Sequence, residues 1–498
     1  MCLFILCLNA CRKADFDEYD HQTTISMQKV ILLLLGVAVL LVEARIGRGL
    51  RIPEVHERSS EANVPVFRFA RDSPKNEDEM RAVTNPSKQC EGYGFKEQSA
   101  MRKKYPKDNE IASILDGDEE AQKIWKEIKE SGIIPEDVKV KKGTEDHMGI
   151  ADDQDDSYPD SDPDCWWTEN QCTKPKHDGL SPDVSECPEK NTWGLTFDDG
   201  PNCSHNAFYN FLEKNKLKAT LFFIGSNVMD WPYQAQRALV DGHDICGHTW
   251  SHHYMTTLSN EEVFAELYYT LRIIKDVVGV TTRCWRPPFG DTDDRVRAIA
   301  HGLGLRTILW SDDTDDWNIE PSGDQPTATI DGNYKSIASK QTAGSYSTGG
   351  PIVLTHEIDN HTMTEFERMY PKLKDAFKHI VPATACMNVT RPYAEEKPKY
   401  PTFKEFVNGE RKPKGLPDSK DMKIHVMAPV TITPVGKQTE PGGYSPKAPA
   451  DKPNGNGTES NTGKKSSDGE DKEGKSGGAV VQPSLYSIII IFIAIISC

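Results

Sequence analysis

The sequence predicts an α/β fold built from parallel βα units, arranged as either a barrel or an open sheet. Short apolar runs typical of strands alternate with amphipathic helical patterns between about residues 187 and 386. Hydrophobic residues make up 37% of the 498-residue chain, which fits one packed core with polar segments around it. Clusters of polar residues come where the strand-like runs end, so we expect them to meet at one edge of the sheet.

The individual elements follow from this periodicity. Residues 261–277 carry Val263, Leu267 and Leu271 on one face and predict an amphipathic helix. Earlier apolar residues at helical spacing predict further helices at 118–130 and 206–216. Strands are expected at 193–197, 220–224, 307–310 and 352–354.

The net charge limits the classes of partner. The chain has 59 Lys and Arg against 76 Asp and Glu, a formal charge of −17. A general nucleic-acid binder needs a basic surface, so we expect no nucleic-acid partner. No obligate protein partner is evident from the sequence.

The N-terminal residues 1–44 are typical of a secretory signal. Met27 and Lys29 precede an apolar run at 30–42, and small residues follow before Arg45. Because residues 1–26 carry charges that no signal should begin with, Met27 is the expected natural start. An uncleaved N-terminal anchor is the alternative.

The C-terminal end predicts a lipid anchor. Residues 485–496 are apolar, and small residues and a short spacer precede them, as in a GPI-anchor signal. Ser476 is the expected attachment residue and 477–498 the removed propeptide. A tail-anchored helix is the alternative, although it would be short for a bilayer. We therefore expect a secreted protein, GPI-anchored at the plasma membrane and cell wall.

Composition divides the rest of the chain into three parts. Residues 45–186 form a polar, acidic region, in which 152–164 is interpreted as a solvated spacer, with calcium binding as the alternative. Residues 187–390 hold the predicted core. Residues 391–476 are rich in Pro, Lys, Gly and Ser and predict a stalk, disordered at least over 446–478.

The cysteines suit an oxidising compartment. Four of the 12 lie in the terminal segments expected to be removed, which leaves eight, an even number that suggests disulfides. A bond between Cys187 and Cys386 would join the ends of the core, but eight cysteines allow 105 pairings. Glycosylation sequons stand at Asn202, Asn360, Asn388 and Asn456.

Two of the polar clusters suit a metal centre. TFDDG at 196–200 ends a strand with the adjacent carboxylates of Asp198 and Asp199, which repel each other and favour a nearby positive charge. HTWSH at 248–252 places two histidines at a spacing that can put both on one face of a helical turn. Two histidines and one aspartate leave open positions on a bound ion, as catalysis requires.

Three more clusters follow in order. They are RPPFG at 286–290, DTDDW at 313–317 and LTH at 354–356. Each of the five, taken alone, is compatible with an ordinary loop or turn. Their joint occurrence at successive strand ends indicates one site.

These five motifs resemble those of the polysaccharide deacetylases of carbohydrate esterase family 4, the NodB homology domain. Within that family the chain is most similar to the GPI-anchored fungal chitin deacetylases. The resemblance covers residues 187–386 of the 498. Phe289 departs from it, because many members have tyrosine there, and so does His253, where proline is frequent.

The resemblance implies a distorted (β/α) barrel with its site at the carboxyl ends of the strands. It implies that Asp199, His248 and His252 bind a divalent metal, with zinc expected and cobalt as the alternative. Asp198 would be the general base, and Arg286 would pair with it.

The same resemblance assigns the remaining roles. His356 would protonate the leaving amine, and Asp316 would orient it. The backbone N–H of Phe289 would help to hold the oxyanion. Trp317 and Leu354 would line the acetyl pocket, although core packing also accounts for these two.

The sequence thus predicts metal-dependent hydrolysis of the N-acetyl groups of chitin, giving chitosan and acetate at the cell wall. The scaffold also permits an acetylxylan or a peptidoglycan deacetylase. A protein of another class, a catalytically silent wall mannoprotein that binds polysaccharide, fits the sequons and stalk equally well. Such a binding module needs no base, acid and metal ligands together, which argues against it.

Overall fold

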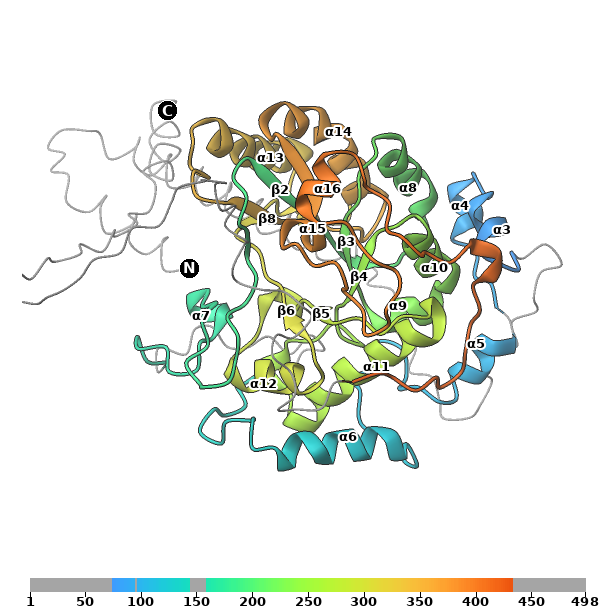
Figure 1. Ribbon diagram of the computed structural model, residues 1–498, viewed down its shortest axis with the longest axis vertical. Coiled ribbons are helices and arrows are strands. Elements are labelled where there is room, and N and C mark those ends of the chain that lie inside the picture. The colour runs from blue at the N-terminus through green and yellow to red at the C-terminus, as the bar shows by residue number, and fades with distance from the viewer. Residues whose placement is uncertain (1–73, 95, 144–157, 433–498) are drawn as a thin grey trace, which may run out of the picture. The chain divides into compact units, whose positions relative to one another are not determined.

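A computed structural model of the protein describes residues 74–94, 96–143 and 158–432, which hold an α/β fold around a curled sheet (Figure 1). The strand order is β1-β8-β2-β3-β4-β5-β6, with β7 paired to β8 and β9 to β2. Every pairing is parallel except that of β1 with β8. The strands are β1 Glu186–Cys187, β2 Thr192–Gly200, β3 Thr220–Phe223, β4 Asp244–Gly247, β5 Cys284–Trp285, β6 Arg306–Thr307, β7 Asp312–Asp313, β8 Gly350–Leu354 and β9 His379–Pro382.

A short segment joins the two edges of this sheet. Val184 forms a parallel bridge with Ile308, directly after β6, and β1 begins two residues later and pairs with β8. The sheet therefore closes on itself, which confirms the distorted barrel and excludes the open sheet. Strand β6 is shorter than the predicted 307–310, and beyond its end the N–H of Leu309 donates to the carbonyl oxygen of Val184.

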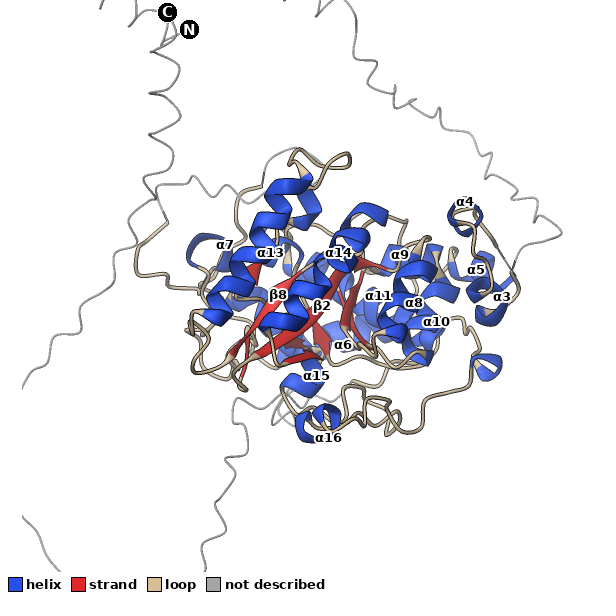
Figure 2. Ribbon diagram, turned by 90° about the horizontal axis from the view of Figure 1, so that it is seen from above, coloured by secondary structure: helices blue, strands red, loops and turns tan. Residues whose placement is uncertain are grey.

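Helices lie outside the strands (Figure 2). The predicted helix at 261–277 is α11, which begins after a capping box made by Ser259 and Glu262 and ends at Gly279, whose φ of 88° favours glycine. The described helices around the barrel are α7 Trp167–Asn170, α8 His205–Lys214, α9 Gly225–Asp230, α10 Pro232–Val240, α11 Asn260–Val278, α12 Asp294–Gly302, α13 Thr327–Thr342, α14 Asn360–Ala376, α15 Ala383–Cys386 and α16 Phe403–Val407.

The described part of the acidic N-terminal region packs onto the barrel. Its helix α6, Glu119–Glu130, lies beside α11 (Figure 1). The Asp118 carboxylate caps α6 and pairs with Arg272 of α11 at 3.0 Å, and Trp125 stacks on Phe264. The segment also holds α3 Glu77–Arg81, α4 Pro86–Gln89 and α5 Lys96–Met101.

Residues beyond both predicted domain boundaries also belong to this packed unit. Asp162 and Asp164, placed by composition in a solvated spacer, are buried and accept hydrogen bonds from Tyr158. On the other side, Tyr393 and Tyr400, in the predicted stalk, are buried, and their hydroxyls bond the main chain next to β4. Paired charges and buried rings hold these polar segments, so composition alone misplaces the edge of the folded unit.

The two predicted targeting segments and residues 433–476 lie outside the described residues. Over 74–94, 96–143 and 158–432, no helix combines the length and the apolar character needed to cross a bilayer.

The eight retained cysteines form four disulfides. Cys187 bonds Cys386 and so joins the segment before β2 to the segment after β9. The other three bonds are Cys90–Cys203, Cys165–Cys172 and Cys246–Cys284.

Candidate active site

A bulge at the end of β2 turns two neighbouring carboxylates toward different partners. Asp198 pairs with Phe222 and Gly200 with Phe223, so Asp199 is an extra residue in the ladder. Its φ of 71° lies in the left-handed region. A bulge of this kind re-aims side chains, which lets adjacent residues serve two separate groups.

Asp198 faces a buried cation. Its Oδ1 lies 2.7 Å from Nη1 of Arg286, and the two side chains are 2% and 0% exposed. The guanidinium also donates to the carbonyl oxygens of Ile308 and Leu309 and lies over the ring of Phe222. A buried ion pair needs such further bonds to offset desolvation, and here they fix Arg286 in place.

Asp199 faces the two histidines. Its Oδ1 lies 3.2 Å from Nε2 of His248 and 3.0 Å from Nε2 of His252. Burial by itself would raise the pKa of Asp199, but the two imidazoles hold it well below its usual range, which favours the ionised form. Nδ1 of His248 lies 2.8 Å from the carbonyl oxygen of Arg286, which leaves Nε2 directed at Asp199.

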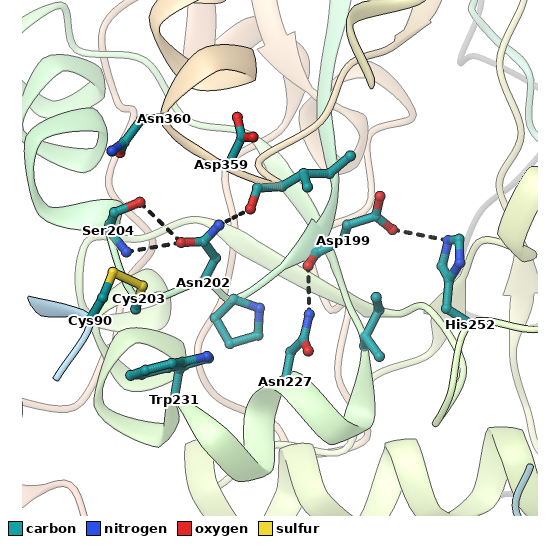
Figure 3. A pocket seen from close by; sticks show the side chains of 13 residues that line it. Cys90, Asp199, Asn202, Cys203, Ser204, Asn227, Trp231, His252, Asp359 and Asn360 are labelled. Atoms are coloured by element: carbon teal, nitrogen blue, oxygen red, sulfur yellow. Dashed lines mark hydrogen bonds and ion pairs between the residues drawn. A yellow bond between two sulfur atoms is a disulfide. The ribbon is translucent and has the colours of Figure 1, made fainter. Parts of the chain in front are cut away.

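These three side chains fit a divalent metal. One ligand atom from each lies within 4.8 Å of the others, and both imidazole Nε2 atoms converge on the same carboxylate oxygen, Oδ1 of Asp199, as Figure 3 shows for His252. A carboxylate oxygen and two imidazole nitrogens that converge in this way form the donor set of a catalytic zinc or a similar ion.

The histidine pair does not lie on a helical turn, contrary to the expectation from its spacing. His248 follows β4, and the chain then turns through positive φ angles at Thr249 and His252. Buried Glu266 of α11 holds the turn by accepting from the backbone N–H groups of Trp250 and Ser251, each at 2.8 Å. Sequence analysis missed Glu266, because nothing local distinguishes it from a helix surface residue.

His356 and Asp316 form a second pair. Nδ1 of His356 lies 2.6 Å from Oδ1 of Asp316, and the backbone N–H of His356 donates to Oδ2 at 3.0 Å. Burial would lower the pKa of His356, but the Asp316 carboxylate raises it to about 10. The imidazole is therefore protonated at neutral pH and can act as an acid.

A cavity of about 350 Å³ is lined by Asp198, by His356 and by the three candidate metal ligands. Phe289 and Trp317 line it with 38% and 51% of their surfaces exposed, so neither is a core residue, whereas Leu354 is 6% exposed. Phe289 has a φ of 58° and stacks on Tyr254 at 4.1 Å. Three lining residues had no role assigned from sequence: Trp310, Asp313 and Ile358.

Glu357 and His205 form a buried pair, and Glu357 lies against Gly200, next to the candidate metal ligand Asp199. Burial raises the pKa of Glu357 well above its usual value and lowers that of His205 to about 3, which favours uncharged forms of both. Their side chains lie 3.3 Å apart. A Cβ atom at Gly200 would stand 1.8 Å from Oε1 of Glu357, so only glycine fits there.

The sequons differ in their surroundings. The side-chain amide of Asn202 donates to the carbonyl oxygens of Glu357 and Ile358, so a glycan there would replace one of the two donating N–H groups. Oδ1 of Asn388 accepts from the backbone N–H of Phe403, while Asn360 is exposed. Asn456 and Ser476 lie outside the described residues.

Comparison with known proteins adds three findings. The family profile "Polysaccharide deacetylase" matches residues 185–308, which include Asp198 and Arg286 and end before Asp316. Chitin deacetylase 2 of Cryptococcus neoformans var. grubii is 50% identical over 329 residues, 66% of this chain and 71% of that protein. Chitin deacetylase of Amylomyces rouxii is 52% identical over 236 residues, 47% of this chain and 55% of that protein.

Among solved structures, the chitin deacetylase of the fungal pathogen Colletotrichum lindemuthianum aligns with a TM-score of 0.39 at 22% identity, over 43% of this chain and 96% of that chain.

Metal binding can be separated from the other roles by substitution. We expect His248→Ala to weaken zinc binding by more than the roughly 10–100-fold that loss of a supporting contact costs, because it removes a ligand. Asp198→Asn should bind zinc nearly as the wild type does, since Asp198 is not among the three ligands. Isothermal titration of metal-stripped protein measures both.

His253→Ala is the matched control, because His253 belongs to the same loop but contacts Ser251 rather than Asp199. Unchanged zinc affinity in His248→Ala, or equal losses in His248→Ala and His253→Ala, would contradict the assigned ligand set.

Proposed function

This chain belongs to the polysaccharide deacetylase family, and we propose that it hydrolyses the N-acetyl groups of chitin to give chitosan and acetate. The observation that carries the proposal is the convergence of the Asp198–Arg286 pair, the metal-binding triad and the His356–Asp316 pair on one cavity. The 50% identity to a chitin deacetylase supports the choice of substrate.

Asp199, His248 and His252 would hold the divalent ion. We propose zinc, with cobalt as the alternative, because two imidazoles and one carboxylate suit either. The bound ion supplies Lewis acidity toward the acetyl carbonyl and lowers the pKa of a water molecule.

Asp198 is placed to take the proton of the attacking water. Its Oδ2 lies 3.8 Å from Nε2 of His248, at the edge of the ligand set, while its Oδ1 is bound by Arg286. The ion pair keeps one carboxylate oxygen engaged, so the other oxygen is the one that can accept a proton.

His356 is placed to protonate the leaving nitrogen. An amine leaves poorly from a tetrahedral centre unless its nitrogen gains a proton, and His356 reaches the cavity already charged. Asp316 holds Nδ1, so the proton to be donated is that of Nε2.

The remaining groups position the acetamido unit. The backbone N–H of Phe289 would donate to the developing oxyanion, and the positive φ of Phe289 sets the direction of that peptide. Trp317 and Leu354 would enclose the acetyl methyl group.

We also propose that the protein acts outside the cell, held by a GPI anchor at Ser476. Four disulfides in the described residues support an oxidising compartment. An anchored enzyme would then act on a polymer of the adjoining wall.

Acetate release from a chitin oligomer tests the reaction. We expect release that stops with a chelator and returns with added zinc or cobalt. Asp198→Asn should keep its zinc and lose roughly 10²–10⁴-fold in turnover, the usual contribution of a general base.

If the folded, zinc-loaded protein releases acetate only from acetylxylan or peptidoglycan, that polymer would replace chitin as the proposed substrate. Release from none of these polymers would favour the binding mannoprotein.

The pH profile tests the acid. In Asp316→Asn the carboxylate that raises the pKa of His356 is gone and burial, which lowers it, remains. We therefore expect the alkaline limb of kcat/KM to move to lower pH, because His356 loses its proton earlier. Tyr334→Phe, which keeps the Asp316 carboxylate, is the control; an unmoved limb in Asp316→Asn would refute the assigned role.

The anchor predicts that a phosphatidylinositol-specific phospholipase C releases the protein from membranes of expressing cells, while Ser476→Leu lowers the anchored fraction. Retention after phospholipase treatment would favour a tail-anchored helix instead.

A further inference from the structure

The turn that carries Phe289 has a strained backbone. Phe289 and Gly290 follow each other in the turn η3, Pro288–Gly290, and both have positive φ angles, of 58° and 73°. Such a conformation costs about 1–3 kcal/mol at a residue other than glycine and persists only where the surroundings hold it. Rotation of the peptide before Phe289 would redirect the N–H that would donate to the oxyanion. The side chains that pack against this turn therefore bear on the direction of that N–H.

Trp167 of α7 lies against the turn. A Cβ atom added at Gly290 would stand 2.1 Å from Nε1 of Trp167, so the indole is in direct contact with the glycine backbone. The backbone N–H of Trp167 donates to the carbonyl oxygen of Thr292 at 3.0 Å. The side chain is buried, with 7% of its surface exposed. Trp167 thus contacts the turn through its ring and the chain just beyond it through its backbone.

The residues on either side of Trp167 bind the carboxylate that follows the turn. Oδ1 of Asp291 accepts from Nε1 of Trp166 at 2.9 Å and from Oγ1 of Thr168 at 2.6 Å. Its Oδ2 accepts from the backbone N–H of Thr256 at 2.8 Å, on the segment that follows the histidine loop. Asp291 is fully buried. Three separate chain segments therefore meet at the end of the turn.

Helix α7 is itself held in place. The Cys165–Cys172 disulfide encloses it. Arg297 of α12 donates to the carbonyl oxygens of Cys165 at 2.6 Å and Cys172 at 2.8 Å, and pairs with Asp183 at 2.8 Å. A side chain can fix its neighbour only when its own position is fixed by packing and hydrogen bonds, and these contacts supply that condition for Trp167.

The same indole contacts one wall of the cavity. Trp310 lines the cavity of about 350 Å³, and Trp167 meets its ring edge-on with the centroids 5.5 Å apart. The guanidinium carbon of Arg286 also lies 5.5 Å from the Trp310 ring. Trp167 therefore touches both the turn with the proposed oxyanion donor and a ring of the cavity wall.

We propose that Trp167 is a positioning residue for the reaction. It acts through Gly290 and Phe289, holding the Phe289 peptide so that its N–H points at the developing oxyanion. The inference rests on the proposed function, which gives that N–H its role. The oxyanion develops only on the way to the transition state, so a misdirected N–H lowers kcat and leaves KM nearly unchanged.

Kinetics of a tryptophan variant test this role. In the full-length, zinc-loaded protein, Trp167→Ala should lower kcat for an N-acetylglucosamine hexamer at least about ten-fold, because complete loss of an oxyanion donor costs roughly 10²–10³-fold. Trp167→Phe, which keeps a ring beside Gly290, should recover most of the loss. Trp125→Ala is the matched control, because Trp125 is similarly buried in the N-terminal region but stacks on Phe264.

Binding of a transition-state analogue separates positioning from a general loss of structure. A methylphosphonamidate analogue of the sugar carries a tetrahedral, anionic group in place of the acetyl carbonyl. Its affinity should fall in Trp167→Ala by the same factor as kcat/KM, while zinc affinity stays that of the wild type. Hexamer binding in the Asp198→Asn background should not change when Trp167→Ala is added.

Melting temperature and zinc content report whether Trp167→Ala folds. Thr168→Val removes one bond to Asp291 with little change in volume, and it should show a smaller loss of the same kind. Wild-type kcat in folded Trp167→Ala, equal losses in Trp167→Ala and Trp125→Ala, or a loss confined to KM would overturn the positioning role and leave the function standing. Absence of acetate release by the wild type would instead overturn the proposed function, and this role with it.

Discussion

The site depends on holding two adjacent carboxylates, those of Asp198 and Asp199, in a buried place. An unpaired buried charge costs several kcal/mol, and two like charges side by side cost more. The bulge at Asp199 separates the pair, and Arg286 then serves both halves. Its guanidinium binds Asp198, while its carbonyl oxygen orients His248 toward Asp199. One residue thereby sets the position of the proposed base and of a proposed metal ligand.

Backbone strain accompanies this arrangement, and side chains outside the five motifs stabilise the strained segments. Asp199, His252 and Phe289 all adopt positive φ, at about 1–3 kcal/mol for each residue that is not glycine. Glu266 of α11 secures the histidine loop, and Glu357 fills the space that Gly200 leaves open. Glu266 and Glu357 are both buried and lie outside the five motifs, and they hold the backbone that positions the candidate metal ligands.

The acidic N-terminal region illustrates why composition is a weak guide to packing. Its carboxylates form ion pairs with specific arginines: Asp118 with Arg272 at 3.0 Å and Asp183 with Arg297 at 2.8 Å. Rings from the same region cover the barrel helices. A segment that looks solvated in sequence is thus part of the folded unit and reaches the edge of the site through Cys90.

The sequence by itself determined the period of the strands and helices, the chemistry of the site residues and their order at strand ends, because these are local properties. Two histidines and one aspartate at strand ends predicted a metal site, and the resemblance to the family indicated Asp199 as the aspartate. Only the tertiary structure decided the bulge that separates the two carboxylates, the loop in place of a helical turn at 248–252 and the choice of one cysteine pairing among many. Those features depend on contacts between segments that are far apart in the sequence, and a local residue pattern does not specify such contacts.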